Sequence, residues 1–150
     1  VGSEMCIRDR GWPKFTQNLW YATADNGIAA LVYAPSEATI KVGQGVDVHV
    51  TETTTYPMGN NIMFTFNFPN SINTSCYFPL HLRIPTWCQE AEIKINGKTI
   101  QLSNSQSGIE VIKREWHAGD QLELILPMKV FTSEWYENSV AVERGPLVYS

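Results

Sequence analysis

A strict alternation of apolar and polar side chains runs through residues 78–84, and it constrains the fold more than any other feature of this sequence. The apolar set comprises Phe78, Leu80, Leu82 and Ile84. A period of two is typical of a strand with one face against a core. Pro85 ends this strand, because proline has no N–H to donate to a neighbouring strand. The alternation resumes at residues 91–95. Asn96-Gly97 then predicts a two-residue hairpin turn, because both residues tolerate positive φ.

The composition indicates one ordinary globular domain. The chain has 150 residues, of which 43% are hydrophobic and 17% charged, enough to bury a core. The net charge is -4 and no basic stripe is present, so nucleic acid is not expected as a partner. No apolar run reaches the length of a membrane span, so a membrane is not expected either. The residues do not indicate a cellular compartment.

From residue 27 onward the chain consists of short alternating segments separated by turn residues. This pattern predicts a mainly β fold, an antiparallel β-sandwich of about ten strands, over residues 27–150. A different pattern precedes it. Four apolar residues recur at the spacing of a helix, namely Trp12, Phe15, Leu19 and Ala22. They predict one amphipathic α-helix of about three turns before the sandwich.

The first ten residues, VGSEMCIRDR, show no periodicity. In-frame translation of a widely used sequencing-library adapter gives the first nine of them. We therefore interpret residues 1–10 as translated adapter and exclude them from the fold. Two cysteines then remain, Cys76 and Cys88, at the two ends of one extended strand. A strand of that length holds its ends roughly 25 Å apart, too far for a disulfide, so two separate thiols are predicted.

Side chains that could carry chemistry are present, but their spacing singles out no site. His49, His81 and His117 lie more than thirty residues apart, whereas zinc ligands recur at short spacings, so we predict no metal site. A glycosidase needs two carboxylates flanking one bond. The available acids alternate with apolar residues as solvent-facing strand positions do; they are Glu92, Glu110, Glu123 and Glu143.

Three tryptophans at strand ends or corners are the candidates for ligand contact: Trp87, Trp116 and Trp135. Exposed aromatic rings at such positions could stack on sugars, and a carbohydrate partner is therefore possible. Aromatic rings at strand ends more often cap a core, and the residues alone leave both interpretations open.

Several segments together resemble one enzyme family, the glycoside hydrolases of family 127 typified by β-L-arabinofuranosidase. The segments follow the family's order and are GWPKFTQNLWYA (11–22), ALVYAPSEATIKV (30–42), TYP (55–57), FPLHLRIPTW (78–87), IKINGK (93–98), REWHAGD (114–120), LPM (126–128) and VAVERGPLVY (140–149). The resemblance places residues 11–26 at the last helix of a helical-barrel catalytic domain. It places residues 27–150 in the β-sandwich that follows the barrel.

The resemblance also implies what this chain lacks. The family uses a zinc-bound cysteine as nucleophile and a glutamate as general acid/base, both upstream of the segment matching Gly11. None of these residues maps onto this chain, so we predict no catalytic residue and no cofactor here, with zinc in the parent's catalytic domain. The implied role is non-catalytic support of that barrel, its intramolecular partner. A carbohydrate-binding module and an oligomerisation domain are the alternatives.

Overall fold

A computed structural model describes residues 14–69, 75–103 and 108–149, so residues 1–10, interpreted as adapter, lie outside the described part. The strands are β1 (Trp20–Ala22), β2 (Ile28–Ala30), β3 (Ser36–Val42), β4 (Val46–Thr54), β5 (Asn61–Asn67), β6 (Ser75–Arg83), β7 (Glu92–Ile95), β8 (Lys98–Ile100), β9 (Ile109–His117), β10 (Gln121–Ile125), β11 (Val130–Glu134), β12 (Val140–Arg144) and β13 (Leu147–Tyr149). A 3₁₀ turn, η1 (Tyr136–Asn138), lies between β11 and β12.

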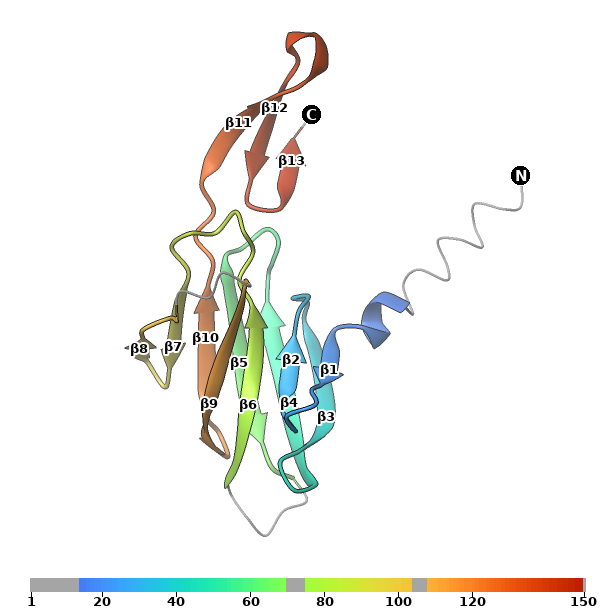
Figure 1. The fold of residues 1–150 in the computed structure, drawn as a ribbon, viewed down its shortest axis with the longest axis vertical. Coiled ribbons are helices and arrows are strands. Elements are labelled where there is room, and N and C mark those ends of the chain that lie inside the picture. The colour runs from blue at the N-terminus through green and yellow to red at the C-terminus, as the bar shows by residue number, and fades with distance from the viewer. Residues whose placement is uncertain (1–13, 70–74, 104–107, 150) are drawn as a thin grey trace, which may run out of the picture.

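Two of the three sheets form the predicted sandwich. One has the strand order β1-β2-β6-β9 and the other β3-β4-β5-β10-β7-β8, and Figure 1 shows them as two overlapping layers. All neighbours pair antiparallel except β2 and β6, which run parallel. The mainly β, antiparallel sandwich predicted from the sequence is therefore confirmed; its four- and six-stranded sheets are joined by a three-stranded one, which brings the described residues to thirteen strands rather than about ten.

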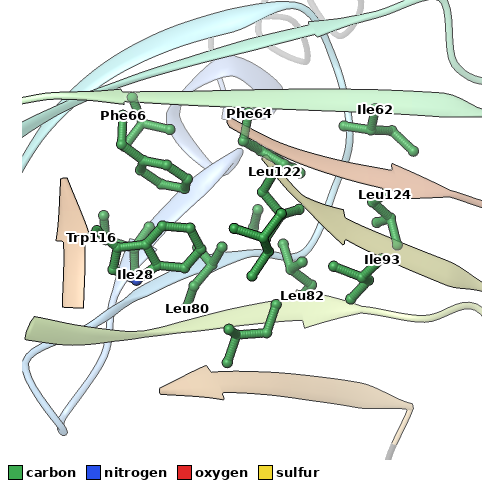
Figure 2. Packing of buried hydrophobic residues seen from close by; sticks show 14 of the residues in the cluster. Ile28, Ile62, Phe64, Phe66, Leu80, Leu82, Ile93, Trp116, Leu122 and Leu124 are labelled. Atoms are coloured by element: carbon green, nitrogen blue, oxygen red, sulfur yellow. The ribbon is translucent and has the colours of Figure 1, made fainter. Parts of the chain in front are cut away.

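The alternation of residues 78–84 builds one wall of the core. Phe78, Leu80 and Leu82 of β6 have no exposed surface, and the Phe78 ring lies 6.0 Å from that of Phe66 of β5 in the opposite sheet. Figure 2 shows this layer of interdigitated side chains, with Leu122 and Leu124 of β10 between the sheets. Burying one such side chain contributes about 1.5–3 kcal/mol, so this layer dominates the stability of the sandwich.

The hairpin predicted at Asn96-Gly97 is confirmed. Asn96 has φ 49° and Gly97 φ 79°, and β7 and β8 pair around them from Ile95 opposite Lys98. Both positive angles belong to the two-residue turn that matches the twist of the paired strands. The Asn96 side chain also reaches the neighbouring turn, where its Nδ2 donates to Asp120 Oδ1 at 2.8 Å.

The N-terminal helix predicted over residues 12–22 is wrong at its C-terminal end. Among the described residues of this range, 14–17 are helical, whereas Trp20–Ala22 form β1, which pairs with β2. Trp20 sits on Phe64, with ring centroids 5.8 Å apart, and its indole N–H donates to Ser36 Oγ at 3.0 Å. The open edge of β2 supplies hydrogen bonds that outweigh the helical spacing of the apolar residues. In the described residues no helix could serve as a membrane span.

The third sheet, β11-β12-β13, lies beyond the sandwich. Figure 1 places it at the end of the molecule, joined to β10 by a single connection. The hairpin between β12 and β13 turns at Gly145, whose φ is 58°. A Cβ atom at position 145 would lie 2.8 Å from the Met128 side chain, so glycine lets this turn pack against the connecting segment.

Candidate functional site

The acids considered for a glycosidase pair are spread over the three sheets. Glu110 belongs to β9, Glu92 and Glu123 to the larger sheet, and Glu143 to β12. Ser103 donates to both oxygens of Glu110, at 2.9 and 2.8 Å, and Asn61 donates to Glu123 at 2.6 Å. These donors, on a neighbouring strand and an adjoining segment, give Glu123 and Glu110 structural partners.

Each of the three histidines lies near one acid, and the two cysteines are free thiols. His81 Nε2 lies 3.0 Å from Asp25, His49 3.9 Å from Glu37, and His117 3.9 Å from Asp120. Among the described residues no three His, Cys, Asp or Glu side chains group closely enough to hold a metal ion. Cys76 and Cys88 are free thiols, as predicted, and burial raises the pKa of both. A raised pKa keeps a thiol protonated, which is the reverse of what a nucleophile requires.

Trp116 is not available to a sugar, which corrects one of the three tryptophan predictions. Its side chain has no exposed surface, and its ring is stacked at 5.8 Å from the Phe78 ring, with the Phe66 ring at 4.4 Å. The indole N–H donates to Phe78 O at 3.1 Å across the β6–β9 pair. Because Trp116 is at a core-facing position of β9, its place near a strand end did not mean exposure.

Trp87 is half-buried and lines a shallow cavity of about 240 Å³. The corner after β6 supplies Trp87, Gln89 and Glu90, the segment after β10 supplies Lys129, and β11 supplies Phe131. Lys129 and Glu90 pair at 2.8 Å, with both side chains exposed. The cavity thus places two aromatic rings beside an amide, a carboxylate and an ammonium.

Trp135 is the exposed member of the three tryptophans, with 66% of its surface accessible. It follows β11, and its indole N–H donates to Ser133 Oγ at 2.8 Å. The structure therefore places Trp87 and Trp135 on separate parts of the surface and Trp116 in the core, so the three do not form one platform.

A larger cavity of about 550 Å³ lies at one end of the β1-β2-β6-β9 sheet. Its lining includes Tyr21 of β1, Val32 after β2, and Ile84 and Thr86 after β6. Tyr21 is 40% exposed and Val32 37% exposed, so the lining is an accessible and mainly apolar surface. We call it the sheet-end groove.

Glu52 is a buried acid that the sequence analysis missed. It is 2% exposed and faces the core from β4, in the same row as Val48 and Val50. Desolvation raises its pKa to about 8, although Ala34 N donates to its carboxyl at 3.0 Å. Continuing the period of two beyond Val50 would have found it, because position 52 falls on the apolar face. The carboxyl secures the backbone after Tyr33, whose hydroxyl donates to Arg83 O at 2.6 Å.

Residues 27–128 match the family model for the β-L-arabinofuranosidase GH127 middle domain. This range contains the strands of the sandwich from β2 to β10. The chain belongs to the GH127 middle-domain family. A comparison with curated proteins finds no match.

Solved structures agree with this assignment to GH127. A GH127 β-L-arabinofuranosidase from Geobacillus stearothermophilus T6 is 27% identical with a TM-score of 0.76, over 88% of this chain and 21% of that one. A structure described as a glycoside hydrolase is 25% identical with a TM-score of 0.82, over 99% of this chain and 25% of that one.

A third structure, a GH127 β-arabinofuranosidase, has 22% identity and a TM-score of 0.71 over 87% of this chain and 23% of that one, which shows a shared fold. This GH127 middle-domain chain thus spans about a fifth to a quarter of the length of the solved structures it matches.

Proposed function

We propose that this chain is the non-catalytic middle domain of a GH127 glycoside hydrolase and that it supports the catalytic barrel of the same polypeptide. The observation that carries the proposal is the match of residues 27–128 to the GH127 middle domain, over the same range as the closed sandwich. The parent activity that this implies is retaining hydrolysis of terminal β-L-arabinofuranosides. Residues 11–26 would then connect the sandwich to the barrel.

The first experiment asks whether the chain has activity of its own. The 150-residue protein, supplied with zinc, is incubated with a chromogenic β-L-arabinofuranoside, and released chromophore is measured. We expect none, because the family's nucleophile and acid/base lie upstream of the residues that match it. Turnover that scales with protein concentration would overturn the non-catalytic assignment.

Support of the barrel requires a contact surface, and the sheet-end groove fits this role. It is apolar, accessible and begins at Tyr21, in the first strand after the segment that would come from the barrel. A partner domain that fills the groove would bury Tyr21 and Val32 and remove an apolar surface from water.

Substitution of Val32 tests this contact in the full-length enzyme. We expect Val32→Lys to shorten the half-life of activity on heating at least about threefold, because it places a charge in the contact. The matched control is Met58→Lys, since the Met58 side chain is 67% exposed and lies at another turn. Equal half-lives for the two variants would exclude the groove as the contact.

Carbohydrate binding at the Trp87 cavity is the second candidate, and the grouping of Trp87 and Phe131 with Gln89, Glu90 and Lys129 supports it. Aromatic faces with nearby hydrogen-bonding groups suit a sugar ring. Titration with arabino-oligosaccharides, followed by tryptophan fluorescence, should give saturable quenching that Trp87→Ala abolishes and Trp135→Ala preserves. No saturable change would reject this candidate.

A further inference from the structure

Glu52 places a carboxyl beneath the segment that connects β2 to β3. The strand that carries it, β4, has nine residues and pairs with β3 on one side and with β5 on the other. Its register sets Glu52 opposite Ser36 and Phe64, so the two cross-strand neighbours are uncharged. Glu52 itself is 2% exposed. The carboxyl is therefore fixed inside the sandwich by a strand that has a partner along each edge.

Hydrogen bonds connect this carboxyl to two other segments of the sandwich. Ala34 N donates to Glu52 Oε1 at 3.0 Å, and Ser36 Oγ lies 3.5 Å from Oε2. The same Ser36 hydroxyl accepts from the Trp20 indole N–H of β1 at 3.0 Å. We call β1 together with the β2–β3 connection, residues 31–35, the cover. Glu52 thus contacts one part of the cover directly and reaches the other part through Ser36.

The hydrogen-bond partners of Glu52 are neutral, and this decides its charge state. Neither the Ala34 N–H nor the Ser36 hydroxyl carries a charge, and among the described residues no Lys, Arg or His side chain forms an ion pair with Glu52. A carboxylate with one close and one distant neutral donor loses more hydration than it regains, so burial favours the protonated acid. Desolvation accordingly raises the pKa of Glu52.

The neighbouring titratable groups keep their charge from about pH 5 to 8. Tyr33 acts on the carboxyl electrostatically, and the Tyr56 ring packs on Tyr33 with centroids 5.9 Å apart. Burial raises the pKa of both tyrosine hydroxyls, so both stay neutral in this range. Arg83 is the cation whose charge reaches the two tyrosines, and its side chain is exposed to water. A proton gained or lost here near neutral pH therefore belongs to Glu52.

The cover is the weaker side of this arrangement. β1 has three residues at the edge of its sheet, and residues 31–35 lie between strands. Short edge elements open at a lower free energy than a strand that is paired along both edges. A charge on Glu52 would therefore be rehydrated by movement of the cover, while β4 stays in place. Tyr21 and Val32, which line the sheet-end groove, belong to the two parts of the cover.

We propose that Glu52 is a proton-dependent latch: the protonated acid holds the cover closed, and loss of the proton releases the cover while the rest of the sandwich stays folded. This inference goes beyond the support of the barrel, because the latch belongs to the chain itself and operates without a partner. Since Tyr21 and Val32 move with the cover, the sheet-end groove is complete only while Glu52 is protonated.

Hydrogen exchange of the 150-residue protein, followed by mass spectrometry from pH 5.5 to 7.5, tests the latch. Protection factors are corrected for the intrinsic pH dependence of amide exchange and compared for peptides within residues 20–36. The carboxyl has a pKa of about 8 under the closed cover and its ordinary 4.5 once hydrated, so opening releases a proton in this range. We therefore expect protection to fall about tenfold per pH unit. Protection that does not change with pH would overturn the proposal.

A urea series at fixed pH separates release of the cover from unfolding of the whole chain. Release of the cover exposes little surface, so exchange of residues 20–36 should change less than about twofold per molar urea. β10 is paired along both edges, and its exchange should accelerate at least about fivefold per molar urea. Equal urea dependence of the two regions would overturn the proposal, because Glu52 would then report on global unfolding.

Two substitutions assign the pH dependence to this carboxyl. Glu52→Gln retains an acceptor for Ala34 N and a donor for Ser36 Oγ but cannot ionise, so the protection of residues 20–36 should become independent of pH. Glu37→Gln is the matched control, since the Glu37 side chain lies on neighbouring β3 and is 67% exposed. It should retain the full pH dependence. The proposal fails if the dependence persists in Glu52→Gln or disappears in Glu37→Gln.

Discussion

The sandwich and the β11-β12-β13 sheet are built from the same kind of alternating strand, yet they differ in what the apolar side chains meet. Phe64, Leu80 and Leu122 meet a second sheet and lose all exposed surface, whereas Val130 and Val140 keep more than half of theirs. Alternation therefore specifies that a strand has an apolar face, and it does not specify that this face is covered. How much an apolar residue contributes to the free energy of unfolding depends on whether its face is covered.

Among single substitutions in the sandwich and the third sheet, that of Trp116 should have the largest effect on stability. We expect Trp116→Ala to lower the free energy of unfolding by roughly 3–5 kcal/mol, because it removes a buried ring from Phe66 and Phe78 and leaves a large cavity. Urea denaturation of the 150-residue chain measures the change. A loss below about 1 kcal/mol would show that the sandwich core is not the main source of stability.

Glu52 is a core position at which burial of a carboxyl opposes stability. Its folded-state pKa is about 8 against an ordinary 4.5, so the folded state holds the proton more tightly than the unfolded state. The stabilisation from the protonated acid is complete below pH 4.5 and is lost as pH rises towards 8.

We therefore expect Glu52→Gln to raise the free energy of unfolding by up to about 3 kcal/mol at pH 7 and to change it little at pH 4. Thermal or urea denaturation across this pH range measures the difference between the two proteins. A pH-independent difference would show that Glu52 is charged, or solvated, in the folded state.

Asp120 links two turns of the sandwich and should have an intermediate effect. The Asp120 carboxylate accepts hydrogen bonds from Asn96 Nδ2 at 2.8 Å and from His117 N at 3.0 Å. These two bonds and the positive charge of Arg114 lower the pKa of Asp120. We expect Asp120→Ala to cost about 2 kcal/mol near neutral pH. The cost should shrink as pH falls below 3.8, because a lowered pKa stabilises the fold only while the carboxylate is charged.

Asp47→Ala is the control for Asp120, since Asp47 pairs at 2.7 Å with Lys41, whose side chain is 72% exposed. An exposed pair contributes about 0.5 kcal/mol, so the two aspartates should differ several-fold in the same denaturation experiment. Similar costs would mean that the Asp120 network adds nothing beyond an ordinary surface ion pair.

The smallest effect is expected in the third sheet. Val142→Ala should change the free energy of unfolding of the 150-residue chain by less than about 0.5 kcal/mol, because its side chain is 40% exposed. Val50→Ala in β4, where Val50 is fully buried, should cost about 2 kcal/mol. If the two variants lost equal stability, the distinction between the sandwich and the third sheet would fail.

Particular residues show why some features could be predicted from sequence and others could not. The Asn96-Gly97 turn and the strand at residues 78–84 were predictable because turn angles and a period of two are local properties. The strand β1 was not predictable, because Trp20–Ala22 become extended only where the edge of β2 offers partners. Burial of Trp116 depended on Phe66 and Phe78, which are distant in sequence, so its position near a strand end was misleading.

The sequence by itself determined that the chain forms alternating strands, where its tightest turn lies and which family it resembles. These properties follow from neighbouring residues, whose backbone preferences and side-chain spacing act over a few positions. Only the tertiary structure decided which apolar faces are covered and that the last three strands stand apart from the sandwich. Burial is a relation between segments that are far apart in the chain, and no local pattern contains it.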